Sequence, residues 1–162
     1  MAAVDLELAC NLIQTKIATA LQPTYVATVP LTTEAYLTAL EDGLCPYVMT
    51  WPGPGSFYQK GGGYKIDDRR FSVFCFVESL AQKTIPLRTH QGIQILQAMR
   101  SLFVTASTIP LATIAADGYQ ITVQSWEGNG HSDTGLTARL PFSGVPWFGF
   151  QMFLNVQTQW II

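Results

Sequence analysis

Charged side chains are scarce in this chain. Of its 162 residues only 12% are Asp, Glu, Lys or Arg, whereas an ordinary soluble domain has roughly 25%. Apolar residues reach 48%, and the mean hydropathy is +0.21. A free monomer of this size needs a surface wetted by charge, so we expect other protein chains to cover much of it. The composition therefore favours a subunit of an assembly.

Positive charge is also missing as a patch. The formal net charge is −2, and the Lys and Arg residues cluster only at Arg69 and Arg70. Such a chain has no general attraction for a phosphate backbone, so we expect no direct nucleic-acid specificity. No run of about 18 apolar residues occurs, and Asp5 and Glu7 stand where a signal peptide would be cationic. We expect a protein made in the cytosol that does not enter a membrane.

Cysteine and histidine are few, which limits the chemistry available. Cys10, Cys45 and Cys75 are far apart in apolar surroundings, a pattern that predicts buried free thiols rather than disulfides. With two histidines and no C-x-x-C or H-x-x-x-H motif, we expect no metal site and no cofactor.

No arrangement of catalytic residue types is convincing either. The sequence His131-Ser132-Asp133 has triad residue types, but neighbours in a glycine-rich loop do not fold back on one another as a triad requires. Cys75 with His90 would make a thiol pair, yet nothing expected in mid-strand lowers the pKa of Cys75. Glycines 61–63 lack the Lys-Ser/Thr pair and the following helix of a phosphate loop. We therefore predict no catalytic residue and no enzymatic activity.

What the sequence does contain is organised around residues 69–103. The dense apolar run 71–77 predicts a central strand covered on both faces. Pro86 then suits the first turn of a helix. The apolar residues of this helix recur at spacings of three and four and predict a stripe that lies on the sheet: Ile93, Leu96, Met99, Leu102 and Phe103.

Shorter elements are expected before this stretch. The patterns predict a helix over 4–21 ended by Pro23, a β segment over 24–30, a short helix over 32–40 stopped at Gly43, and a strand over 45–51. From Pro52 to Gly63, backbone freedom and missing donors predict the longest flexible loop.

The C-terminal half alternates as strands do. Residues 119–124, 136–142 and 147–157 each place apolar side chains at every second position, and the polar, glycine-rich segment 127–135 predicts a mobile connection. Because strands and helices do not alternate here, we expect an α+β fold. It would be a single domain spanning 1–162, with a mainly antiparallel (mixed) sheet, helices packed on one face, and flexible loops at about 52–68 and 127–135.

Two tryptophans and a charged set are candidates for contacts between subunits. Trp126 and Trp147 fall opposite the apolar face of their strands or at an edge, which is typical of an interface; the alternative is a second small core. Arg69, Arg70 and Glu78 flank the central strand, where in a chain this poor in charge they favour an intersubunit pair.

With these pieces placed, the chain resembles the tail terminator (tail completion) proteins of long-tailed bacteriophages. The resemblance is carried by the N-terminal helix, the glycine-rich segment before 69–74 (RRFSVF), the helix end 99–103 (MRSLF) and the closing strand 148–156 (FGFQMFLNV). It implies a virion protein without catalytic residues, assembled in the host cytoplasm into a hexameric ring. One face of the ring would dock on the tail-tube protein and the other on the head connector.

Within this resemblance the two loops are expected to meet the partners. The candidate partner-binding residues are Tyr58, Gln59, Lys60, Tyr64, Lys65, Asn129, His131 and Asp133. One alternative is another head-to-tail joining subunit, such as a neck or head-closure protein. A second is a small-molecule-binding or hydrolytic α+β domain that uses the mouth between residues 52–64 and 127–135.

Overall fold

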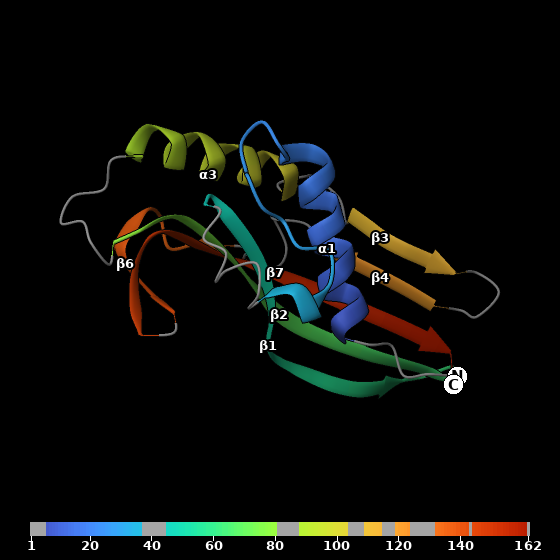
Figure 1. Ribbon diagram of the computed structural model, residues 1–162. Coiled ribbons are helices and arrows are strands. Elements are labelled where there is room, and N and C mark those ends of the chain that lie inside the picture. Colours follow the sequence, from blue (N-terminus) through green and yellow to red (C-terminus); the bar gives the residue numbers. More distant parts are fainter. Residues whose placement is uncertain are drawn as a thin grey trace.

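An antiparallel sheet with two helices on one face forms the core of the molecule (Figure 1). The computed structural model describes residues 6–36, 45–80, 88–103, 109–114, 119–123, 132–142 and 144–161. Every strand pair in the described sheet is antiparallel, and one isolated parallel bridge joins Thr28 to Tyr47. The expected α+β fold is confirmed.

Two long strands form the centre of the sheet. Strand β2 (Tyr64–Ser79) pairs with β7 (Val145–Ile161) along nearly its whole length, from Tyr64 opposite Ile161 to Ser79 opposite Trp147. Residues 71–77 lie inside β2, so the predicted central strand is confirmed, although it is longer than the apolar run. The last strand also extends beyond its predicted bounds of 147–157.

Shorter strands complete the sheet on both sides of this pair. Strand β1 (Tyr47–Lys60) pairs with β2. The free edge of β7 is occupied in turn by β6 (Thr137–Phe142), β5 (Ser132–Asp133) and β4 (Tyr119–Val123). Strand β3 (Ile109–Ile114), which the sequence did not predict, pairs with β4, so the path runs β1-β2-β7-β4-β3.

Both helices pack their apolar stripes on the same face. Helix α1 (Leu6–Leu21) buries Ala9, Ile13, Ile17 and Leu21 as predicted. Helix α3 (Thr89–Phe103) begins later than expected, and Pro86 lies outside the described residues. Its buried stripe is Gly92, Ile95, Met99 and Phe103. Ile93, predicted for this stripe, is exposed because it lies about 200° from Ile95 around the helix.

The segment from Pro52 to Gly63 is a β-hairpin, so the predicted long flexible loop is wrong. Proline is tolerated here because β1 is an outer strand, and a bulge between Pro52 and Gly55 takes up the irregularity. A Cβ at Gly53 or Gly55 would lie 2.3 Å from Arg70 O or 2.5 Å from Asp68 O, so these glycines permit close strand contact. Residues 61–63 form the turn of this hairpin.

Other expectations are also corrected. Residues 24–30 make one bridge at Thr28 and no strand. In the predicted helix over 32–40, η1 (Thr33–Ala35) is a 3-10 turn and Tyr36 is helical, and residues 37–40 lie outside the described part of the chain. In the 127–135 connection, Ser132 and Asp133 form β5 against Phe153 and Met152. Residues 127–131 lie outside the described part of the chain.

A second, smaller core covers one end of the other sheet face. Because Val48 and Cys75 face the helices, the neighbouring pair Tyr47 and Phe76 faces away from them. There they pack with Tyr36, Met49, Leu140 and Trp147. The ring centroids of Phe76 and Trp147 are 5.0 Å apart.

A buried glutamine attaches α1 to the sheet and the chain that precedes it. Gln14 Nε2 donates to Pro30 O at 3.0 Å and to Val48 O at 2.9 Å, and its Oε1 accepts from the Thr50 hydroxyl at 2.7 Å. The side chain is completely buried. Removing it would leave three buried polar groups without these bonds.

We predict that Gln14→Met lowers the free energy of unfolding by about 2–4 kcal/mol, since each orphaned buried group costs about 1–3 kcal/mol and Met roughly preserves the volume. Urea unfolding followed by circular dichroism measures this difference. The matched control is Gln22→Met, because exposed Gln22 makes one bond, to Ala27 O. Equal losses for the two variants would contradict the role assigned to Gln14.

Candidate interaction surface

The sheet face turned away from the helices is largely uncovered beyond the second core. Residues directly opposite each other in a ladder share a face, and Phe71, Val73, Leu154 and Val156 occupy the helix side. The intervening residues form what we call the open face: Trp51, Asp68, Arg70, Ser72, Phe153, Asn155 and Gln157. This surface is exposed or half-buried.

A hollow of about 410 Å³ lies on β2 and β7 at this face. Its lining residues are Pro54, Asp68, Arg69, Arg70, Asn155, Val156 and Gln157. Arg69 and Val156 direct their side chains toward the helix side by the same alternation, so the polar side chains in the hollow are those of Asp68, Arg70, Asn155 and Gln157.

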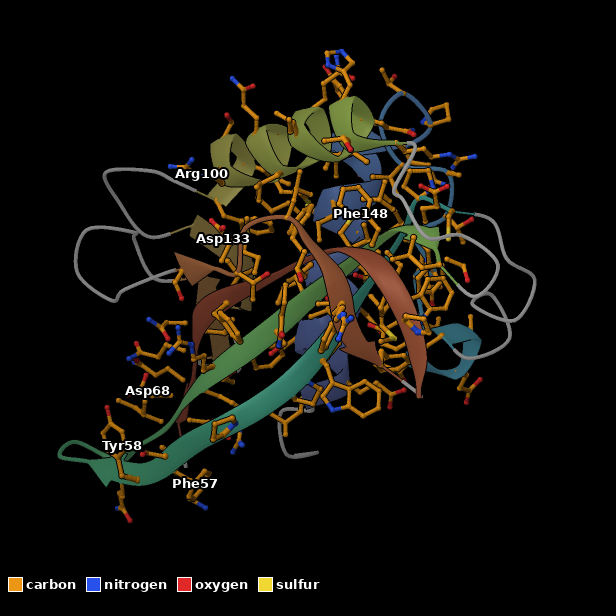
Figure 2. The ribbon with its side chains drawn as sticks, turned by 90° about the vertical axis from the view of Figure 1, so that its left-hand side faces the viewer. Phe57, Tyr58, Asp68, Arg100, Asp133 and Phe148 are labelled. Carbon is orange, nitrogen blue, oxygen red and sulfur yellow. The ribbon has the colours of Figure 1, made fainter. Side chains whose placement is uncertain are left out.

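The carboxylate of Asp68 is held by neutral donors. Tyr58 donates its hydroxyl to Asp68 Oδ2 at 2.7 Å, and Gln157 Nε2 donates to Oδ1 at 2.9 Å. The hydrogen bond to Asp68 raises the pKa of Tyr58, since the phenol must keep its proton to donate it. These bonds tie the end of the β1–β2 hairpin to β7, and Figure 2 shows Tyr58 beside Asp68 at that end.

The guanidinium of Arg70 lies on the same face but makes no ion pair. Its Nη2 donates to Ser132 Oγ at 2.6 Å, and its carbon is 4.6 Å from the ring centroid of Phe153. Among the described residues, Arg70 has no carboxylate within salt-bridge distance. The structure does not test whether Arg70 contacts another subunit, as the sequence predicts.

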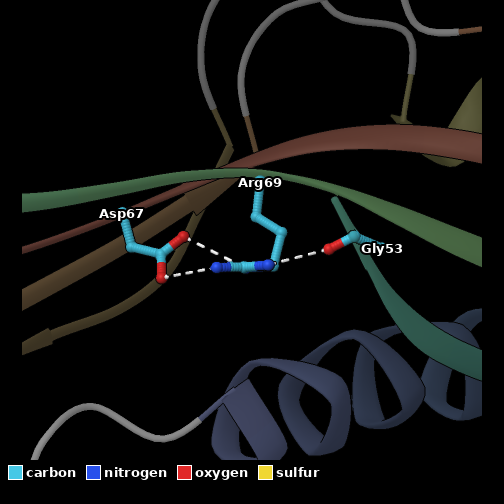
Figure 3. A network of polar contacts seen from close by, with 3 residues as sticks. All are labelled: Gly53, Asp67 and Arg69. Carbon is cyan, nitrogen blue, oxygen red and sulfur yellow. Dashed lines mark hydrogen bonds and ion pairs between the residues drawn. The ribbon is translucent and has the colours of Figure 1, made fainter. Parts of the chain in front are cut away.

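Arg69, predicted to contact another subunit, is engaged within its own chain (Figure 3). Its Nε and Nη2 donate to the two oxygens of Asp67 at 3.2 and 3.3 Å, and its Nη1 donates to Gly53 O at 2.9 Å. The side chain faces the helix side, opposite Val156, where it holds the bulged part of β1. Arg69 therefore has a structural role within its own chain, and its contact with another subunit stays a prediction.

Trp147 and Glu78, also predicted at an interface, are buried. Trp147 is 8% exposed and belongs to the second core, so the stated alternative holds for it. Glu78 follows a bulge between Phe76 and Glu78 that puts it opposite Phe148, a residue of the helix-side core. Neither side chain is available to a neighbouring subunit, and Trp126 lies outside the described residues.

Three exposed aromatic side chains mark β1. Trp51 is 49% exposed, Phe57 59% and Tyr58 41%. Of the predicted partner-binding residues nearby, Gln59 is exposed and Lys65 is half-buried, whereas the side chains of Lys60 and Tyr64 are not described. The sequence analysis missed Trp51 and Phe57; the strand alternation that reveals them was obscured by the prolines and glycines between them.

The other predicted partner-binding residues belong to the segment 127–135, of which only residues 132–135 are described. Asp133 Oδ1 accepts from the backbone N–H of Gly135 at 2.7 Å, which closes a turn after β5. Asn129 and His131 lie outside the described residues. Among the described residues, a hydrogen bond from Arg70 of β2 to Ser132 joins the central pair of strands to this segment.

The described ranges hold no candidate metal site. They contain no group of three His, Cys, Asp or Glu side chains suited to a metal ion. Cys10 and Cys75 are buried free thiols as predicted, and Cys45 is half-buried. Burial raises the pKa of the Cys75 thiol, so it is a poor nucleophile. Neither α1 nor α3, the α-helices among the described residues, is long and apolar enough to span a membrane.

No protein-family model matches the chain, and no curated protein matches it.

We predict that the Cys45→Ser variant, while folded, resists labelling by Ellman's reagent at pH 8. Both remaining thiols are buried, and the raised pKa keeps the Cys75 thiol protonated. In urea the same variant should label at Cys10 and Cys75. Absorbance at 412 nm follows both reactions. Rapid native labelling of Cys75, located by peptide mass mapping, would show that the thiol is accessible and reactive.

Proposed function

We propose that this chain is a structural subunit of a bacteriophage virion. It would form a ring that closes the tail tube and joins it to the head connector. The ring stoichiometry of six comes from the resemblance to tail terminator proteins, which rests on the order of elements and on short sequence stretches.

The observation that carries the proposal is the exposed aromatic edge of β1. Trp51, Phe57 and Tyr58 are exposed in a chain with only 12% charged residues. Large aromatic rings are enriched at the energetic centres of protein interfaces. Figure 2 shows Phe57 and Tyr58 at the end of the hairpin, on the side of the molecule away from α3. This arrangement favours a protein whose surface is completed by other chains.

Strands β1 and β3, at the two ends of the β1-β2-β7-β4-β3 path, favour contacts through side chains rather than strand addition. Strand β1 contains Pro52 and Pro54 with a bulge, and β3 contains Pro110 with a bulge before Ala112. Proline has no N–H to donate, and a bulge disturbs the regular ladder. A ring contact that abuts the sheet is therefore favoured over one that extends it.

A neck or head-closure subunit is the alternative within the same setting, since it would have the same need for covered surface. The two are distinguished by the partner: a terminator binds the end of purified tail tubes, whereas a head-closure subunit binds the connector of filled heads. Negative-stain imaging of the protein mixed with each particle provides this test.

We predict that Phe57→Ser with Tyr58→Ser weakens self-association or tube binding by roughly 30-fold or more, the equivalent of about 2 kcal/mol for a hot spot. Sedimentation velocity and binding to tube ends measure the change. The control is Ile93→Ser, which removes an apolar side chain of similar exposure, 50%, from α3.

Three results would count against the proposal. One is a double variant that assembles and binds as well as the wild type. Another is an equal defect in the Ile93→Ser control. The third is a wild-type protein that neither forms rings nor binds either particle.

A further inference from the structure

Arg70 has no counter-ion among the described residues, although an acid is nearby on the same face. Asp68 is two residues away on the same side of β2, yet its two oxygens accept from Tyr58 and Gln157. Arg70 is turned instead toward Ser132 and Phe153. Because the ring and the hydroxyl fix the guanidinium while using one donor nitrogen, the other nitrogens remain available to an acceptor.

Asn155 adds a second donor at the same place. It stands directly opposite Arg70 in the β2–β7 ladder and lines the same hollow. Its side-chain amide makes no hydrogen bond to any described residue. A planar guanidinium beside an amide NH₂ group matches the two oxygens of a carboxylate.

The surroundings favour a carboxylate on a protein over other anions. Asp68 lines the hollow too, and its charge repels a dianionic phosphate more strongly than a singly charged carboxylate. Small molecules are generally bound in enclosed, mostly apolar pockets, whereas this hollow is polar and lies on a sheet face. An acidic side chain projecting from another polypeptide fits it better.

The described part of the chain offers one suitable acid. Among the described residues, Asp67 pairs with Arg69, Asp68 and Asp133 accept the bonds given above, Glu78 is buried, and Glu7 accepts from Thr33. Glu34, in η1, is exposed and has no assigned contact there. Leu31, three residues earlier, is exposed as well. The surface with Glu34 and Leu31 therefore presents an acid and an apolar side chain. The open face presents a complementary pair, the cation Arg70 and the exposed aromatic side chain of Trp51.

We propose that Glu34 of one copy binds Arg70 and Asn155 of the next. Leu31 would then pack near the Trp51 of that neighbour. The two surfaces differ, so the contact is head-to-tail, and it closes into a ring when the rotation per subunit fits a whole number. This inference rests on the proposed ring-forming function and specifies which residues make the contact.

A charge-exchange experiment tests the pairing. Sedimentation velocity over a range of concentrations compares the wild type with Arg70→Glu, Glu34→Arg and the double variant. Each single change should raise the dissociation constant at least about tenfold, because like charges then meet, and the double variant should recover to within roughly threefold of the wild type. Arg100→Glu is the control, an exposed cation reversed on α3 (Figure 2).

A second variant, Arg70→Lys, tests the pairing even if Arg70→Glu fails to fold. It keeps the charge and loses the planar fork, so association should weaken severalfold while the circular dichroism spectrum stays unchanged. The pairing is overturned if both single reversals behave like the Arg100→Glu control, if the double variant fails to recover, or if the wild type is monomeric at every concentration. Rings of Arg70→Glu on tube ends would overturn the pairing and leave the proposed function standing.

Discussion

The antiparallel pairing of β2 with β7 is the constraint on which the rest of the fold depends. One face of this pair carries the residues that pack against both helices. The outer edge of β2 pairs with β1, and the outer edge of β7 pairs with β6, β5 and β4. The pairing leaves no room for a side chain at Gly149, where a Cβ would lie 1.9 Å from Cys75 O. The strands can approach this closely only because a glycine stands at that position.

Much of this arrangement follows from periodicity. The alternation of Phe148, Phe150, Met152, Leu154 and Val156 predicts the buried side of β7, and the spacing of Ala9, Ile13, Ile17 and Leu21 predicts the buried side of α1. Both patterns are long enough for the burial of apolar area to outweigh local preferences. The α+β class and the antiparallel sheet were predictable on this basis.

The errors have local physical causes. Prolines and glycines at 52–63 indicate a loop when each residue is considered alone, but an outer strand tolerates missing donors, and the close approach to Arg70 O and Asp68 O requires glycine. Glu78 was misplaced because a bulge after Phe76 changes the face that it occupies. Trp147 lies on the predicted face, opposite the apolar side of β7, but the second core covers that end of the face. Sequence spacing does not reveal a bulge. The open face was likewise beyond prediction, since it depends on the register that brings Asn155 opposite Arg70.

The proline and the bulge in each of β1 and β3 affect how the polypeptide behaves at high concentration. A chain with few charges has little electrostatic repulsion to keep its copies apart, and exposed strand edges are the usual templates for amyloid-like stacking. In β1 and β3 the edge lacks donors at Pro52, Pro54 and Pro110, so an incoming strand cannot complete a continuous ladder there. The chain can thus expose the aromatic side chains of β1 while the backbone edges of β1 and β3 resist the addition of further strands.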